Sequence, residues 1–196
     1  MQSTSTLIGR FSGLATIIGG LLWALGGSTA LNADTFGITM EGPHTLLTLA
    51  GLGSLIGLAR LAGHHAGDYG RAGVAGTILA SAGVVLIIVS KNLPSDTSET
   101  VGWALFDVGG LLLVVGCLLF GIAALRTKAW ILGGPLLAIG VLVILQLVFL
   151  MGPLAETTYL GTVVLPTLIG FAWSSLGYAL WSHQGGTVRR PAYRAT

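Results

Sequence analysis

Long apolar stretches separated by short polar segments occupy most of the 196-residue chain. Each stretch is close to the ~20 residues that a helix needs to cross a bilayer core. Helices are favoured because lipid leaves unpaired peptide groups unsatisfied, and the short alternating segments of a membrane β-barrel are missing from the sequence. The pattern predicts an all-α integral membrane protein, a six-transmembrane-helix bundle with spans at about 8–30, 43–63, 72–91, 101–125, 129–152 and 158–181.

The positively charged residues predict an orientation for these spans. One side of the six-span pattern carries Arg10, Arg60, Arg71, Arg126, Lys128, Arg189, Arg190 and Arg194. The other side carries Lys91 with Asp34, Glu41, Asp96, Glu99 and Glu156. Since Lys and Arg collect in cytoplasmic loops, both termini are expected in the cytoplasm, in a multi-pass protein of the cell (cytoplasmic) membrane. Residues 1–185 are expected to form one membrane domain, followed by a short basic cytoplasmic tail at 186–196.

Small residues recur at fixed steps and predict an internal repeat. Gly13, Gly73 and Gly133 open the first, third and fifth spans, and seven residues after each of them stands another small residue. The second, fourth and sixth spans share a Gly–large–Ala–any–large pattern near their predicted cytoplasmic ends. We therefore expect three tandem helical hairpins in the same orientation.

Composition and motifs narrow the classes of function. Only 8% of the residues are charged, against about 25% in soluble domains, and no basic face is available to bind nucleic acid. The single cysteine excludes an intrachain disulfide, and His64-His65 lacks the further ligands of a metal site. The sequence contains no GxxxxGK[ST], GxSxG or HExxH motif, which weakens the case for an enzyme, and we predict no cofactor.

Stripes of small residues predict which faces pack against other helices. The fourth predicted span presents Trp103, Asp107, Gly110, Val114, Cys117 and Gly121 at steps of four and three. This stripe is expected to face the bundle, and the other side, with Leu105, Leu112, Leu119 and Phe120, is expected to face lipid. The second span adds a GxxxG pair, so the candidate helix-packing residues are Gly53, Gly57, Gly110, Cys117 and Gly121. Gln146, deep in the fifth span, is expected to bond to a neighbouring helix.

Asp107 is the leading candidate for function because a carboxylate inside a span costs about 2.5–3.5 kcal/mol at the bilayer centre. A carboxyl group in that position must be protonated, paired with another side chain or in contact with water. Lys91 is the nearest predicted counter-charge, although a lysine at the end of a span normally directs its ammonium group to water. His44, after Gly42-Pro43, is expected at the interface. The candidate intramembrane site therefore comprises Asp107, Lys91, His44 and Trp103.

Three hypotheses for function follow from these patterns. The leading one is a non-catalytic polytopic membrane protein, an accessory, assembly or stress-related component, because the spans carry few polar groups and the loops are short. Its partners would be the lipid bilayer and either further copies of itself or a larger membrane complex. The alternative is a small channel or a proton- or cation-coupled transporter that moves a small solute or ion by way of Asp107. The third is a cofactor- or quinone-binding membrane subunit.

Overall fold

A computed structural model describes residues 4–64, 69–94, 97–151 and 159–182. Throughout these residues the regular structure is helical: α1 Thr4–Leu31, α2 Ala33–Phe36, α3 Glu41–His64, α4 Gly70–Lys91, α5 Glu99–Arg126, α6 Trp130–Met151, the π-helical turn η2 Leu160–Val164, and α7 Leu165–Ser182. Six segments are long and apolar enough to span a membrane, and η2 together with α7 makes the sixth. The predicted six-span helical membrane protein is confirmed.

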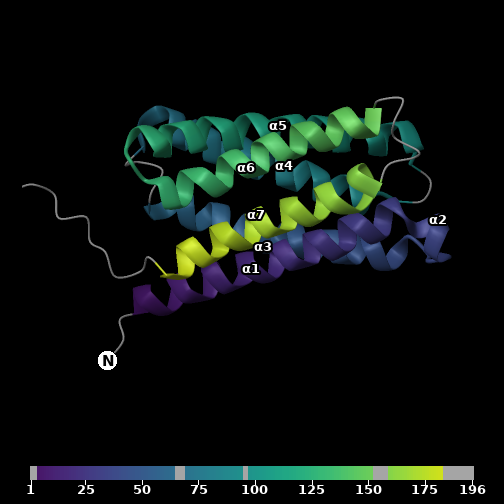
Figure 1. The fold of residues 1–196 in the computed structure, drawn as a ribbon, viewed down its shortest axis with the longest axis horizontal. Coiled ribbons are helices and arrows are strands. Elements are labelled where there is room, and N and C mark those ends of the chain that lie inside the picture. The colour runs from purple at the N-terminus through teal and green to yellow at the C-terminus, as the bar shows by residue number, and fades with distance from the viewer. Residues whose placement is uncertain (1–3, 65–68, 95–96, 152–158, 183–196) are drawn as a thin grey trace, which may run out of the picture.

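The six spanning helices form a closed ring in chain order. Each contacts its neighbours along the chain, and α1 and α7 close the ring. Within the ring α1 lies between α3 and α7, while α5 lies between α4 and α6, so the bundle has two layers of three helices (Figure 1). We call the end of the bundle where α1 finishes and α3 begins the α2 end; α1 begins and α7 finishes at the opposite end (Figure 1).

Helix α1 packs through small residues and turns its large side chains outward. Its buried positions are Gly9, Ser12, Gly13, Thr16, Gly19, Gly20 and Gly26. Leu7, Phe11, Leu14, Ile18 and Leu25 are exposed on its outer surface. Lipid tails are as apolar as these side chains, so burying them offers little gain in a membrane, and close backbone approach drives the packing instead.

Glycines lie at the closest contacts between neighbouring antiparallel helices. A Cβ added to Gly83 of α4 would lie 2.5 Å from the carbonyl oxygen of Gly109 of α5. A Cβ on Gly20 of α1 would lie 2.5 Å from the carbonyl oxygen of Gly170 of α7. These contacts are closer than any real Cβ permits, so both interfaces require glycine.

The contacts of the small residues differ among the three predicted hairpins. Gly20, in the first predicted hairpin, lies against α7, the second helix of the third hairpin. Gly140, in the third hairpin, lies against Leu118 of α5, the second helix of the second hairpin. Ala80 instead lies against Gly116 of α5, which belongs to its own hairpin. The hairpin repeat therefore stays a prediction.

The core lies between the two layers and centres on Trp173 of α7 and Phe120 of α5, both at most 2% exposed. The expectation that Phe120 faces lipid is wrong. Four residues of the predicted stripe, Gly110, Val114, Cys117 and Gly121, are buried, and the buried face also extends through Gly109, Leu113, Gly116 and Phe120. At about 100° per residue, the centre of the whole buried face is roughly 70° from that of the predicted stripe. Small residues stand on both sides of the predicted stripe, so the sequence alone did not show which face of α5 is buried.

Candidate functional site

The four predicted site residues all lie at the α2 end of the bundle, on three helices. His44 is in the first turn of α3, Lys91 is the last residue of α4, and Trp103 and Asp107 are in the first turns of α5. Their positions at helix ends follow from the antiparallel order of α3, α4 and α5. The structure brings Lys91 and Trp103 together and leaves Asp107 apart from them.

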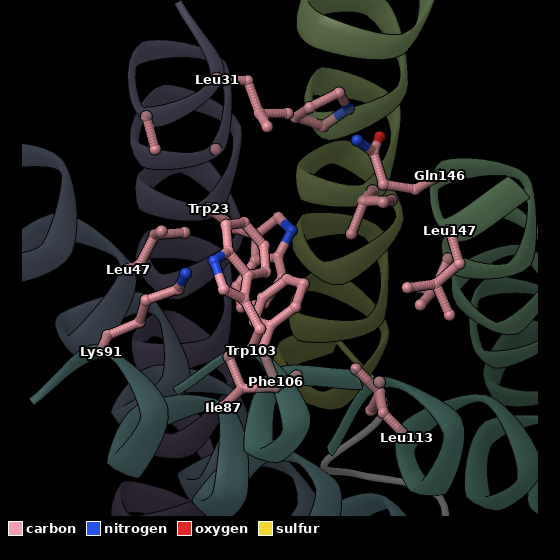
Figure 2. Close-up of a pocket in the computed structure, with 16 residues that line it drawn as sticks. Trp23, Leu31, Leu47, Ile87, Lys91, Trp103, Phe106, Leu113, Gln146 and Leu147 are labelled. Atoms are coloured by element: carbon pink, nitrogen blue, oxygen red, sulfur yellow. The ribbon is translucent and has the colours of Figure 1, made fainter. Parts of the chain in front are cut away.

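A pocket of about 100 Å³ opens between the helices at this end (Figure 2). All six spanning helices contribute to its wall. It is lined by Trp23, Gly27, Ala30, Leu31, Leu47, Ile87, Lys91, Trp103, Phe106, Gly110, Leu113, Val143, Gln146, Leu147, Pro166 and Ile169. Among the described residues of this wall, Lys91 carries the only formal charge, and Gln146 is the only neutral polar residue apart from the tryptophan N–H groups.

Small residues leave the space that this pocket occupies. Gly27 and Ala30 of α1 line it on one side, and Gly110 of α5 lines it on the other. A Cβ on Gly110 would be in ordinary contact with the methyl groups of Leu147, at 3.6 and 3.7 Å. Farther from the α2 end, Trp173 and Phe120 fill the space between the layers, so the pocket is confined to one end of the bundle.

The Lys91 ammonium group lies over aromatic rings of α5. Its Nζ is 4.4 Å from the ring centroid of Phe106 and 5.5 Å from that of Trp103. The two rings meet edge to face with centroids 6.1 Å apart. Figure 2 shows the side chain directed toward the cluster that Trp23, Trp103 and Phe106 form. Cation–π contacts of this kind contribute about 0.5–2 kcal/mol, more as the cation loses water.

Asp107 is half-buried and does not line the pocket. No described residue forms a hydrogen bond or an ion pair with its carboxylate, so the Lys91–Asp107 pair considered from the sequence does not form. The rotation of α5 explains this position. Asp107 lies on the flank of the buried face, next to Val108, which is 48% exposed toward the bundle exterior.

His44 lies beside Lys91 in a polar contact between α3 and α4. The Asn92 side-chain nitrogen donates to the Thr48 hydroxyl at 2.8 Å, and that hydroxyl donates to the backbone oxygen of His44 at 2.9 Å. His44 is partly buried and close enough to Lys91 for their charges to interact. The Asn92 nitrogen also donates to the Ile88 backbone oxygen at 2.8 Å, so this side chain joins the end of α4 to α3.

Two side-chain amides satisfy backbone oxygens at the start of α7. Pro166 has no N–H, so neither Thr162 in the α-helical pattern nor Gly161 in the π-helical pattern can receive a bond from it. Gln146 of α6 donates to the Gly161 oxygen at 3.0 Å, and Asn32 donates to the Thr162 oxygen at 3.2 Å. The sequence singled out Gln146 as a helix–helix contact and missed Asn32. The proline inside the sixth predicted span was the available signal.

The candidate packing residues lie at helix contacts away from the pocket, apart from Gly110. A Cβ on Gly53 would lie 2.8 Å from the Gly19 Cα atom, and Gly57 faces Thr16, also on α1. A Cβ on Gly121 would lie 2.7 Å from the Leu137 side chain of α6, and Cys117 is fully buried in the core.

The described residues contain no group of three His, Cys, Asp or Glu side chains placed to hold a metal ion. His65, Asp96, Glu156 and the predicted tail at 186–196 lie outside those residues. No protein-family model, curated protein or solved structure matches the chain.

Proposed function

We propose that the chain is a non-catalytic membrane protein that holds a small, largely apolar molecule between its helices at the α2 end. The observation that supports this proposal is the pocket to which all six spanning helices contribute. Concave sites with apolar and aromatic walls and a few convergent polar groups are typical of small-molecule binding. An accessory role in a membrane would then depend on the bound molecule rather than on a reaction.

The size of the pocket limits the ligand. An engineered cavity of about 150 Å³ in another protein holds benzene, so a pocket of about 100 Å³ accepts a group of roughly that size or smaller. The flat faces of Trp23 and Trp103 suit a ring or the end of a short alkyl chain. Because Asp107 does not line this pocket, we do not propose a conduit through it.

We also propose that the α2 end faces out of the cell and that both termini are cytoplasmic. Arg10, Arg60, Arg71, Arg126 and Lys128 all lie near helix ends opposite the α2 end, where only Lys91 is found among the described cations. Such an excess is typical of the cytoplasmic side. A C-terminal tag that is accessible from outside intact cells would contradict this orientation.

Quenching of tryptophan fluorescence tests the binding proposal, because Trp23 and Trp103 line the pocket. The probe is 6-bromohexan-1-ol, whose bromine quenches tryptophan at short range, titrated into the purified protein in detergent. We expect saturable quenching in the wild type. Ala30→Phe should abolish it by filling the pocket, while Leu25→Phe, on the exposed face of the same helix, should preserve it. Quenching that never saturates, and is equal in all three proteins, would contradict the proposal.

A further inference from the structure

We propose that the pocket selects a small organic anion, with a carboxylate head group on the Lys91 ammonium and an apolar body against the aromatic wall. This inference rests on the proposed function and names the class of ligand. It is carried by the placement of one cation among aromatic rings at the wall of a pocket whose other described lining residues are mostly apolar.

The Lys91 ammonium has no carboxylate partner among the residues that the structure describes. Asp34, Glu41, Glu99 and Asp107 are the described acidic residues, and none forms an ion pair with it. Ring faces attract a cation but do not neutralise its charge. A half-buried cation in an apolar wall therefore gains more from an anion than a group in water does.

The charge of Lys91 favours an anion over a cation. The neighbouring Asn92 amide nitrogen does not add to this preference, because it already donates to the Thr48 hydroxyl and to the Ile88 backbone oxygen, both at 2.8 Å. A carboxylate bound in the pocket is attracted by the Lys91 ammonium group, whereas a bound cation would be repelled by it.

The rest of the pocket sets the shape of the anion. Trp103 and Phe106 border the ammonium group, and Trp23 of α1 also lines the pocket (Figure 2). A carboxylate at Lys91 therefore places the adjoining carbons against these rings. The volume of about 100 Å³ restricts the buried body to a single ring or a short chain. A short-chain or aryl carboxylate meets both requirements, while a long acyl chain would extend beyond the pocket.

A matched pair of probes separates the charge from the apolar body. We would titrate 6-bromohexanoate and 6-bromohexan-1-ol into the protein at neutral pH and follow tryptophan quenching. The acid should bind about tenfold tighter than the alcohol, since a charge-assisted hydrogen bond is stronger than a neutral one. Equal affinities with saturable binding of both probes would overturn the anion inference and leave the proposed function standing. No saturable binding of either probe would overturn both.

Variants at Lys91 assign the preference to its charge. In Lys91→Met, the acid should bind only as tightly as the alcohol. Lys91→Arg should keep the preference for the acid over the alcohol, and Lys128→Met, at the opposite end, should leave this preference unchanged. Alcohol binding by Lys91→Met shows that the pocket is intact. A preference that survives in Lys91→Met would overturn the inference.

Two acidic residues outside the described part of the chain provide a further test. Asp96→Asn and Glu156→Gln should leave the preference for the acid unchanged. If the protein prefers the acid over the alcohol only in one of these variants, the replaced carboxylate forms an ion pair with Lys91 in the wild type. That result would overturn the inference.

Discussion

Pro166 removes a backbone donor where η2 meets α7, and the side chains of Gln146 and Asn32 replace it. The sequence allowed Gln146 to be predicted as a contact between helices, because an amide inside a span needs a partner. It did not reveal which carbonyl would accept, since the acceptor depends on a local change from α-helical to π-helical backbone. The position of Asp107 was hidden for a related reason, because its environment depends on the rotation of α5.

Replacing Gln146 should destabilise the bundle through the Gly161 carbonyl oxygen. Gln146→Leu leaves that oxygen without its donor, and the free energy of unfolding in detergent should fall by about 0.6–2 kcal/mol. In a Pro166→Ala background, residue 166 regains an N–H, and the same replacement should cost less. Equal losses in the two backgrounds would show that the amide acts elsewhere.

Removing the charge of Asp107 should stabilise the protein. Its carboxylate is partly exposed on a membrane-spanning helix and has no partner among the described residues, so its placement in lipid is unfavourable. Asp107→Asn should raise the free energy of unfolding by up to about 2.5 kcal/mol and leave 6-bromohexan-1-ol binding unchanged. Glu99→Gln, at the exposed start of the same helix, serves as the control and should change stability little. Loss of binding in Asp107→Asn would instead favour a functional carboxylate.

At the scale of elements, the spans were predictable and their buried faces were predictable only in part. Length and apolar content located six helices because a bilayer demands both. In a soluble protein the large apolar residues would then mark the buried face. Here α1 buries glycine, serine and threonine and exposes leucine and phenylalanine, so hydrophobicity does not separate the two faces. On α5, where both faces carry small residues, the predicted orientation was wrong at Phe120.

Glycines at close helix contacts should tolerate no side chain, unlike glycines on the surface. Gly83→Leu would drive atoms into the Gly109 carbonyl and the Leu113 backbone nitrogen, and should lower the free energy of unfolding by at least about 1–3 kcal/mol. A Cβ on Gly134 meets nothing within 4 Å, so Gly134→Leu should be neutral or slightly stabilising. Thermal unfolding in detergent, monitored by circular dichroism, compares the two variants. Equal effects would contradict the packing of α4 against α5.

At the scale of the whole molecule, the six-helix class followed from the sequence, while the closed ring and the pocket did not. The contact of α1 with α7 joins segments that are far apart in the chain, through glycines that resemble the many others in this sequence. The pocket depends on where Trp173 and Phe120 fill the interior and where Gly27, Ala30 and Gly110 leave it open. Both features require the relative rotation of all six helices, which composition does not encode.

The ring of helices also has a consequence for chain connectivity. The first and last helices are direct neighbours, and a Cβ on Gly13 would lie 2.7 Å from the Trp181 Cβ, so the start of α1 and the end of α7 are adjacent (Figure 1). A circular permutant that begins at α4, with α7 linked to α1, keeps every helix contact and every membrane crossing direction. It should insert, fold and retain saturable probe binding. A second permutant, opened between α5 and α6, serves as a comparison. If both permutants fail to fold, insertion must begin with α1.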